Sequence, residues 1–362
     1  MTSGLDDVIA AETVLSEVDG QGGHLTIRGH ALRELAGRRD FASVTHLLFE
    51  DFFADLPNEK ELAARLGHAR VEVFERVKAL LPTLAALSVY DGMRAGTALM
   101  PDGDTLDDAL RLIAAPAVLT PALLRLRKGL DAIAPDANAG HAADMLAMLT
   151  GTGANRNLSA ALDTYLVTVC DHGLNASTFA ARVVASTQAG LTSSALAGLG
   201  ALKGPLHGGA PGPVIAMLDA IAATGDATGW LDRELAEGRR IMGFGHRIYR
   251  VRDPRADVLK TVVRRIGPDG AVGRRLAFAE TVEQAALDVL GRAKPGRVLQ
   301  TNVEFYTALL LEAAGFPEEA FTCVFAAGRM AGWIAHAREQ QATGRLIRPQ
   351  SRYIGPVPDL VA

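Results

Sequence analysis

The chain is dominated by alanine and leucine, has few runs of β-branched residues, and carries helix-breaking residues at intervals of helix length. Alanine and leucine have the highest helix propensities, so this pattern favours an all-α protein. The only strand that the sequence predicts is a short alternating segment between glycines, residues 24–28.

Prolines predict where several helices begin. At Asp253-Pro254 the aspartate can cap a helix whose first position suits proline, and Thr120-Pro121 predicts a second start in the same way. Pro317 predicts a longer helix that runs to about Thr343 and stops at Gly344. We therefore expect helices to begin at Pro254, Pro121 and Pro317, and the last of them to end before Gly344.

The bulk properties are those of a globular chain of 362 residues, of which 49% are hydrophobic and 22% charged, so a large core and two domains are expected. A net charge of −4 argues against a general affinity for nucleic acid or acidic membranes. The N-terminus lacks the pattern of a signal peptide, and the most apolar windows, such as residues 189–202, look too short to span a bilayer. Only two cysteines occur, without metal-ligand spacing, which fits a cytoplasmic protein without disulfides.

The helix predicted from Pro317 is rich in small residues that would let another helix approach closely, and Arg329 lies in the middle of them. A buried arginine needs an anionic partner, because an unpaired buried charge costs about 3–5 kcal/mol. A structural ion pair and a substrate clamp are both open for Arg329.

Familiar catalytic motifs are absent from the sequence. The glycine-rich residues 198–209 lack the Gly-Lys-Ser/Thr of a phosphate-binding loop, and neither His-Glu-x-x-His nor Gly-x-Ser-x-Gly occurs. Kinase, dehydrogenase, zinc-enzyme and serine-hydrolase functions therefore lose support.

Two histidines are bordered by glycines, His207 in Gly-Pro-Leu-His-Gly-Gly and His246 in Gly-Phe-Gly-His-Arg, and Glu304 follows Asn302-Val303. Glycine permits close approach of the backbone to a ligand. Taken alone, each histidine is better interpreted as an ordinary loop residue than as a catalytic residue. Together, two imidazoles and a carboxylate suit proton transfer at carbon, which needs a base, donors for the enolate oxygen and an acid, but no metal.

A cluster of three arginines, Arg250, Arg252 and Arg255, surrounds the helix start at Asp253-Pro254. Free N–H groups at a helix N-terminus also attract anions. This segment is either a solvated basic turn or a site for carboxylates or phosphates.

Six ordered motifs resemble the citrate synthase family, and the resemblance extends over almost the whole chain, from Gly4 to Pro356. The motifs are Asp171-His172-x-x-Asn175-Ala176-Ser177-Thr178, Gly204-Pro205-Leu206-His207-Gly208-Gly209, Gly243-Phe244-Gly245-His246-Arg247, Asp253-Pro254-Arg255-Ala256, Asn302-Val303-x-Phe305-Tyr306 and Arg348-Pro349. The chain is most similar to the short bacterial type, which also includes 2-methylcitrate synthases.

The resemblance implies an all-α homodimer in which a small domain, residues 210–315, closes over a large domain of residues 1–209 and 316–362. It implies condensation of acetyl-CoA with oxaloacetate, then hydrolysis to citrate and CoA, with the CoA thioester as substrate and no cofactor or metal. The alternatives are a 2-methylcitrate synthase that uses propionyl-CoA, and a non-catalytic homologue that binds CoA esters or dicarboxylates.

The resemblance also implies roles for individual residues. Glu304 would be the base, His207 the donor to the thioester oxygen, and His246 the group that polarises and protonates the oxaloacetate ketone. The expected oxaloacetate ligands are His172, His246, Arg255 and Arg329, with Arg348 reaching in from the neighbouring subunit. The expected CoA-binding residues are Arg250, Gly243, Phe244, Gly245 and Asn302.

Two departures from the family pattern bear on substrate preference. Glu304 stands where the family commonly has aspartate, and one extra methylene moves a carboxylate by roughly 1.5 Å, whereas catalytic groups need placement within about 0.5 Å. Val169 and Gly173 replace a histidine and a glutamate that commonly flank the Asp-His pair. We expect the backbone to compensate for the longer base, because the other catalytic motifs are intact.

Overall fold

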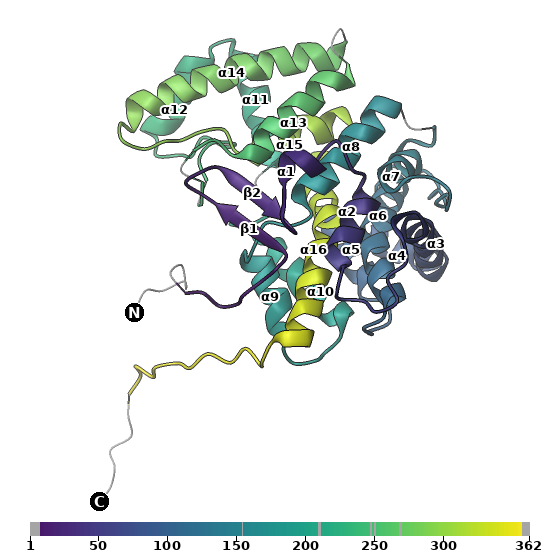
Figure 1. Ribbon diagram of the computed structural model, residues 1–362. Helices are drawn as coiled ribbons and strands as arrows, with labels where there is room; N and C mark the ends of the chain where they lie inside the picture. Colours follow the sequence, from purple (N-terminus) through teal and green to yellow (C-terminus); the bar gives the residue numbers. More distant parts are fainter. Residues whose placement is uncertain are drawn as a thin grey trace, which may run out of the picture.

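The computed structural model describes residues 8–153, 155–208, 211–246, 248–249, 251–267 and 270–356, and within these ranges it is mainly helical (Figure 1). The main helical body holds helices from both ends of the chain. These are α1 (Leu32–Leu35), α2 (Phe41–Phe49), α3 (Glu59–Val77), α4 (Leu81–Ala85), α5 (Val89–Thr97), α6 (Leu106–Arg127), α7 (His141–Thr150), α8 (Arg156–Val169), α9 (Ala176–Ala185), α10 (Leu191–Leu202) and, after the 3-10 turn η1 (Glu318–Ala320), α16 (Phe321–Thr343).

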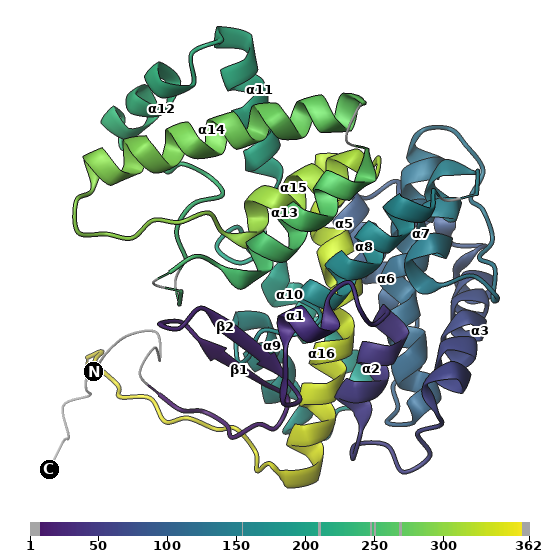
Figure 2. The same cartoon turned by 45° about the horizontal axis from the view of Figure 1, so that its top comes forward.

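The remaining helices gather at one end of the molecule in both views (Figures 1 and 2). This α11–α15 group comprises α11 (Gly212–Thr224), α12 (Ala227–Ala236), α13 (Pro254–Ile266), α14 (Ala271–Ala293) and α15 (Val303–Ala313). It meets the main body where α13 and α15 pack on α8. The all-α prediction is confirmed.

One small antiparallel sheet accompanies the helices, with strands β1 (Ser16–Asp19), β2 (His24–Ile27) and β3 (His30–Ala31) in the order β1-β2-β3. The strand predicted at residues 24–28 exists, but the prediction that it is alone was wrong. Of its partners, β1 (Ser-Glu-Val-Asp) has a single apolar residue and β3 has only two residues, so neither shows a clear alternating pattern. The turn between β1 and β2 lies against the segment before α13, so closely that a Cβ on Gly20 would lie 2.5 Å from the carbonyl oxygen of Ile248.

Helix α6 is the centre of the main body and packs against α3, α5, α7 and α16. The prediction that Thr120-Pro121 starts a helix was wrong, because α6 continues through both Pro116 and Pro121. An internal proline costs about 3 kcal/mol through its missing hydrogen bond. Complete burial of the flanking side chains, for example Leu119 and Leu123 at 0% exposure, offsets that cost.

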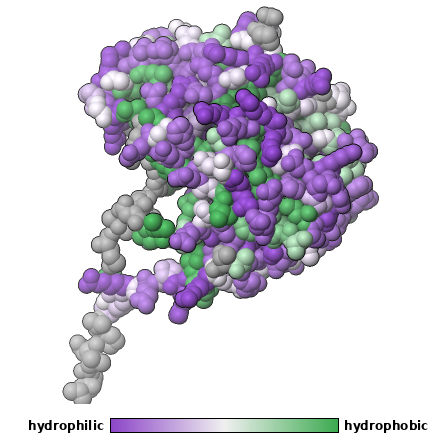
Figure 3. All heavy atoms as spheres, in the orientation of Figure 1, coloured by the Kyte–Doolittle hydropathy of each residue, from purple (hydrophilic) through white to green (hydrophobic). Residues whose placement is uncertain are grey.

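By length and composition α6 could also cross a membrane, so the expectation that every apolar window is too short was wrong for Leu106–Arg127. The helix is mostly buried inside the protein, as expected of a core helix. Polar residues cover most of the molecular face seen in Figure 3, with apolar residues in scattered groups.

Helix α16 begins at Phe321 rather than at Pro317, because η1 precedes it, and it ends at Thr343 with Gly344 as its cap, as predicted. Its small residues allow a close approach of α8: a Cβ on Gly332 would lie 2.2 Å from the carbonyl oxygen of Cys170. Arg329 is therefore presented from a helix whose backbone touches the end of α8.

Both cysteines, Cys170 and Cys323, are free and buried. In the described part of the chain, no group of three or more histidine, cysteine, aspartate or glutamate side chains could hold a metal ion.

Candidate active site

Most of the side chains that the sequence singles out meet where the main helical body joins the α11–α15 group: His246 lies next to His172 and Arg255, and the charge of Arg255 acts on Glu304 and Arg329. His207 is linked to this set through the charge of Arg329. Three of them come from loops: His172 follows α8, His207 follows α10 and His246 precedes α13. The other three lie on helices: Arg255 on α13, Glu304 on α15 and Arg329 on α16. Asp253 caps α13 as predicted, accepting the backbone N–H of Arg255.

Two glycines and an asparagine tie the loop that carries His246 to the start of α15. Gly243 and Gly245 have φ of 85° and 80°, in the left-handed region that favours glycine. The amide of Gly245 donates to the carbonyl oxygen of Gln300 at 2.8 Å, and the amide of Asn302 donates to that of Gly243 at 3.0 Å. The Asn302 side chain also donates to the carbonyl oxygen of Gly245 at 2.9 Å. These predicted CoA-binding residues thus form one joint, in which Phe244 bridges to Thr301.

The hydrogen bonds around His246 define its tautomer. Its Nδ1 accepts the backbone N–H groups of Ile248 and Tyr249, each at 3.0 Å. The proton of the neutral ring therefore sits on Nε2, which lies 3.1 Å from a guanidinium nitrogen of Arg255. Two donors face each other there, and a ligand oxygen that accepts from both would relieve the arrangement.

Burial, and then the Arg255 charge, lower the pKa of His246 to about 4, so the ring is neutral near pH 7. A neutral Nε2–H remains a hydrogen-bond donor that can pass its proton to a developing alkoxide. His172 lies beside this ring at 5.7 Å between centroids, and its Nε2 is 3.2 Å from the hydroxyl of Tyr249. Burial, reinforced by Arg255 and Arg329, lowers the pKa of His172 far below its usual value.

His207 is oriented by a hydroxyl. Its Nε2 lies 2.7 Å from Ser177 Oγ, which also accepts the indole N–H of Trp333 at 3.1 Å. The other acceptor for the single Ser177 proton is Asn175 Oδ1 at 2.8 Å, but that oxygen already caps α9 by accepting from the amides of Ser177 and Thr178. We therefore assign the hydroxyl proton to His207 Nε2, which leaves the ring proton on Nδ1, available to a ligand.

Glu304 is held in the first turn of α15, where Asn302 caps the helix and accepts its N–H. Its Oε2 is buried and has no hydrogen-bond partner among the described residues. Burial raises the pKa of Glu304, although the Arg255 charge opposes the rise. A carboxylate with a raised pKa and a free oxygen is a stronger base than one in water.

Arg255 is fixed by Asp253, whose two oxygens accept from its Nε at 3.0 Å and from a terminal nitrogen at 2.8 Å. The same carboxylate accepts the N–H of Val303 at 3.1 Å, at the start of the helix that carries Glu304. Asp253 therefore joins Arg255 to the start of the helix that carries Glu304.

Arg329 is 1% exposed, and among the described residues its hydrogen bonding is limited to Nε–H and the carbonyl oxygen of Val169, at 2.6 Å. Its guanidinium carbon lies 4.7 Å from the centre of the Phe325 ring. Burial lowers the pKa of Arg329 to about 10, against the attraction of Asp171. A buried cation with spare donors is arranged for an anionic ligand, which favours the clamp over the structural ion pair.

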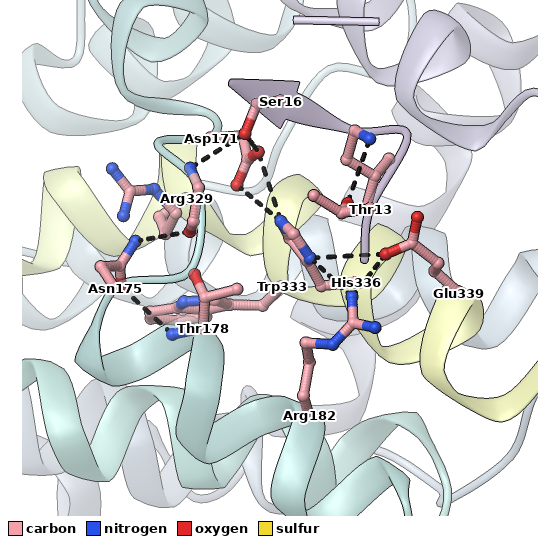
Figure 4. A network of polar contacts seen from close by, with 12 residues as sticks. Thr13, Ser16, Asp171, Asn175, Thr178, Arg182, Arg329, Trp333, His336 and Glu339 are labelled. Atoms are coloured by element: carbon pink, nitrogen blue, oxygen red, sulfur yellow. Dashed lines mark hydrogen bonds and ion pairs between the residues drawn. The ribbon is translucent and has the colours of Figure 1, made fainter. Parts of the chain in front are cut away.

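A network of charges supports the turn that carries His172 (Figure 4). Asp171 accepts from the hydroxyl of Ser16 and lies 3.2 Å from Nε2 of His336. Arg182 donates to Nδ1 of His336 at 3.0 Å and pairs with Glu339. The network links β1, α9 and α16 beneath the candidate site.

The structure does not bring Arg348 to the site. It is exposed on the extended segment that leaves the body after α16 (Figure 1). Arg250 lies outside the described residues.

Sequence reasoning gave no role to Ser177 and Tyr249. Ser177 belongs to the Asn-Ala-Ser-Thr motif, which indicates a helix start capped by Asn175 but not a contact with His207. Tyr249 follows His246 by three residues, and only the folded loop places its hydroxyl on His172.

The pKa of His207 yields a prediction about stability. Burial, and then the charge of Arg329, lowers this pKa to about 4. Between about pH 6.5 and pH 4, His207 therefore binds a proton in the unfolded chain but stays neutral in the folded protein. This residue therefore removes stability as the pH falls from about 6.5 to 4. The His207→Gln variant lacks this titration. When the pH is lowered from 7 to 5, its unfolding free energy should therefore rise by about 1 kcal/mol relative to that of wild type, after allowance for the partial exposure of His207. Urea unfolding at both pH values measures this; an equal difference at the two values would contradict the neutral buried ring.

Taken together, the fold and the site define an all-α protein in which histidines and a glutamate lie near two buried arginines, Arg255 and Arg329. A family profile described as "Citrate synthase, C-terminal domain" matches residues 4–350, and the chain belongs to the citrate synthase family. The chain is 36% identical to the "Putative citrate synthase 2" of Mycobacterium tuberculosis, over 98% of this chain and 93% of that protein. It is 34% identical to the 2-methylcitrate synthase of the same organism, over 97% and 90%.

Solved structures agree with the sequence relatives. The citrate synthase of the archaeon Thermoplasma acidophilum, solved in a ternary complex with carboxymethyl coenzyme A and oxaloacetate, matches with a TM-score of 0.86 at 28% identity, covering 99% of this chain and 97% of that one. The family and the fold expected from the six motifs are therefore confirmed.

Proposed function

We propose that this protein is a citrate synthase that condenses acetyl-CoA with oxaloacetate and hydrolyses the product to citrate and CoA. The observation that carries the proposal is the meeting of two donors, His246 Nε2–H and Arg255, at 3.1 Å near Glu304, whose buried Oε2 has no hydrogen-bond partner among the described residues. A ketone or carboxylate oxygen would fit between the donors, next to a base that can generate a carbon nucleophile.

The bond-forming step follows from the hydrogen bonds of the two glycine-bordered histidines. Glu304 takes a proton from the acyl carbon next to the thioester, while His207 Nδ1–H donates to the thioester oxygen as negative charge develops there. The enolate carbon then attacks the ketone carbon of oxaloacetate. His246 Nε2–H would donate to the ketone oxygen and protonate the alkoxide as it forms.

Oxaloacetate carries two carboxylates, and the site offers two buried arginines with His172 beside them. Arg255 is held in one plane by Asp253, so its remaining N–H groups are pre-organised for a carboxylate. Arg329, which forms no ion pair among the described residues, would gain a directly bound anionic partner. The CoA thioester would bind as a substrate. The joint of Gly243, Phe244, Gly245 and Asn302 is proposed to contact its CoA part, together with Arg250.

The decisive experiment is release of free thiol from acetyl-CoA by the purified protein, with and without oxaloacetate. We expect steady release that depends on oxaloacetate. Binding of both ligands by calorimetry without release would instead support the non-catalytic homologue.

A second candidate keeps the mechanism and uses propionyl-CoA, giving 2-methylcitrate, as the similarity to a 2-methylcitrate synthase suggests. One methylene in an apolar pocket is worth only about 1–3 kcal/mol, so the two activities can coexist. The ratio of kcat/KM for acetyl-CoA and propionyl-CoA decides between them.

The assembly and domain roles are part of the same proposal. We expect a homodimer in which Arg348 of each subunit reaches its partner's site, because the segment after α16 leaves the body and exposes Tyr353 at 70% and Ile354 at 90%. We expect residues 210–315 to close on residues 1–209 and 316–362 as a small domain, with the substrates between them. A cytoplasmic location remains a prediction from the sparse, free cysteines.

A further inference from the structure

One buried carboxylate in the α11–α15 group has no part in the mechanism above. Glu283, on α14, is 4% exposed and accepts four donors. The hydroxyls of Thr301 and Tyr306 each donate at 2.6 Å, Lys260 at 2.8 Å and Arg252 at 3.3 Å.

The donors come from segments that carry the proposed catalytic residues. Thr301 and Tyr306 bracket the base, three residues before and two residues after Glu304. One oxygen of Glu283 holds Thr301 and the other holds Tyr306, so a single carboxylate fastens both ends of residues 301–306. Arg252 precedes the Asp253 that holds Arg255.

A purely structural role would be met by fewer contacts. Desolvating a carboxylate costs several kcal/mol, and two cations on α13 and its N-terminal segment would suffice to compensate it. Here the two shortest bonds go instead to neutral hydroxyls on either side of the base. These bonds restrict the first turn of α15, and hence the position of a side chain whose own Oε2 has no hydrogen-bond partner in the described part of the chain.

We propose that Glu283 is a positioning residue for the reaction: it fixes the Thr301–Tyr306 segment and so holds the Glu304 carboxylate at the reacting carbon. The proposal rests on Glu304 acting as the base.

The test is Glu283→Gln, which keeps the size of the side chain and removes its charge. A misplacement of about 1 Å can cost on the order of 100-fold in rate, so kcat should fall about 10- to 100-fold. The KM for oxaloacetate should change less than about threefold, because His172 and Arg329 lie on the main body and Asp253 holds Arg255. If Glu283 only stabilised the fold, the folded Glu283→Gln variant would have the same kcat and the same KM for oxaloacetate as wild type.

Glu280→Gln is the matched control. Glu280 lies on the same helix and pairs with Lys260 at 3.5 Å and Arg264 at 2.6 Å, but in the described structure it bonds neither Thr301 nor Tyr306. Its replacement makes the same charge change and should leave kcat within about twofold of wild type. Equal losses in the two variants would overturn the proposal, as would a folded Glu283→Gln enzyme with kcat within threefold of wild type.

Milder variants keep the test decisive if Glu283→Gln does not fold. Thr301→Val and Tyr306→Phe each remove one hydroxyl, and each should lower kcat about 3- to 30-fold with little change in the KM for oxaloacetate. Normal kcat in both would overturn the proposal. Glu304→Gln separates the two claims: if it keeps its turnover the base assignment fails, whereas loss there with normal turnover in the Glu283 variants rejects only the positioning role.

Discussion

Glu304→Gln should lower kcat by about 10³-fold or more while the protein keeps its fold. The carboxylate is the only base that the mechanism provides for the acyl carbon, and a positioned general base contributes about 10²–10⁴-fold. Glutamine has nearly the same shape and cannot take the proton. Stability should be retained or increased, because burial already disfavours the charged form and raises the pKa of this group. The measurement is oxaloacetate-dependent thiol release, with circular dichroism to verify folding.

Glu304→Asp is the matched control, since it keeps the carboxylate and shortens its reach by one methylene. We expect turnover between those of wild type and Glu304→Gln, because the anchored segment places the base for the longer side chain. Near-normal turnover of Glu304→Gln would remove this residue from the role of base.

Arg329→Met should separate binding from stability. The guanidinium is buried with one hydrogen bond among the described residues, and lowering its pKa from 12.5 to about 10 corresponds to about 3 kcal/mol of unfavourable burial in the charged form. That cost is present at all pH values below about 10. Methionine has a similar volume and no charge, so it removes this cost. The ligand-free variant should therefore be more stable than wild type by about 1–3 kcal/mol in unfolding free energy, and it should unfold at a higher urea concentration. Its KM for oxaloacetate should rise at least about 100-fold, because a buried carboxylate loses its charged partner.

Arg70→Met provides the contrast. Arg70 is equally buried but pairs with Asp144 at 2.6 Å and donates to two backbone carbonyl groups. Removing it leaves an uncompensated buried carboxylate, so this variant should lose about 3–5 kcal/mol of stability and keep its KM. Destabilisation of Arg329→Met by a similar amount, with an unchanged KM, would make Arg329 a structural ion-pair partner.

The helical class and the Asp253-Pro254 helix start could be predicted from the sequence because they depend on local propensity and capping. Thr120-Pro121 misled for the opposite reason: burial on all sides of α6 outweighs a local preference that would break it. The strands beside β2 were missed because hairpin pairing, not alternation within four or two residues, defines them.

The candidate site could be predicted as a set of residue types, but not as a geometry. The neighbouring glycines indicated His207 and His246 as candidates. The proton position of His207 depends on Ser177, and that of His246 depends on the amides of Ile248 and Tyr249, and residue spacing reveals neither contact. Arg329 remained ambiguous until its sparse hydrogen bonding was visible. Glu283 was not singled out at all, because a lone glutamate in an amphipathic helix looks like a solvated residue until four donors surround it.

The most direct test of the account is a crystal structure of the protein with oxaloacetate and carboxymethyl coenzyme A, a thioether that cannot condense. We expect the ketone oxygen of oxaloacetate between His246 Nε2 and Arg255, a carboxylate on Arg329, and the carboxymethyl group between His207 Nδ1 and Glu304. Ligands bound elsewhere, or a closed complex in which these three side chains do not share one reacting carbon, would contradict it.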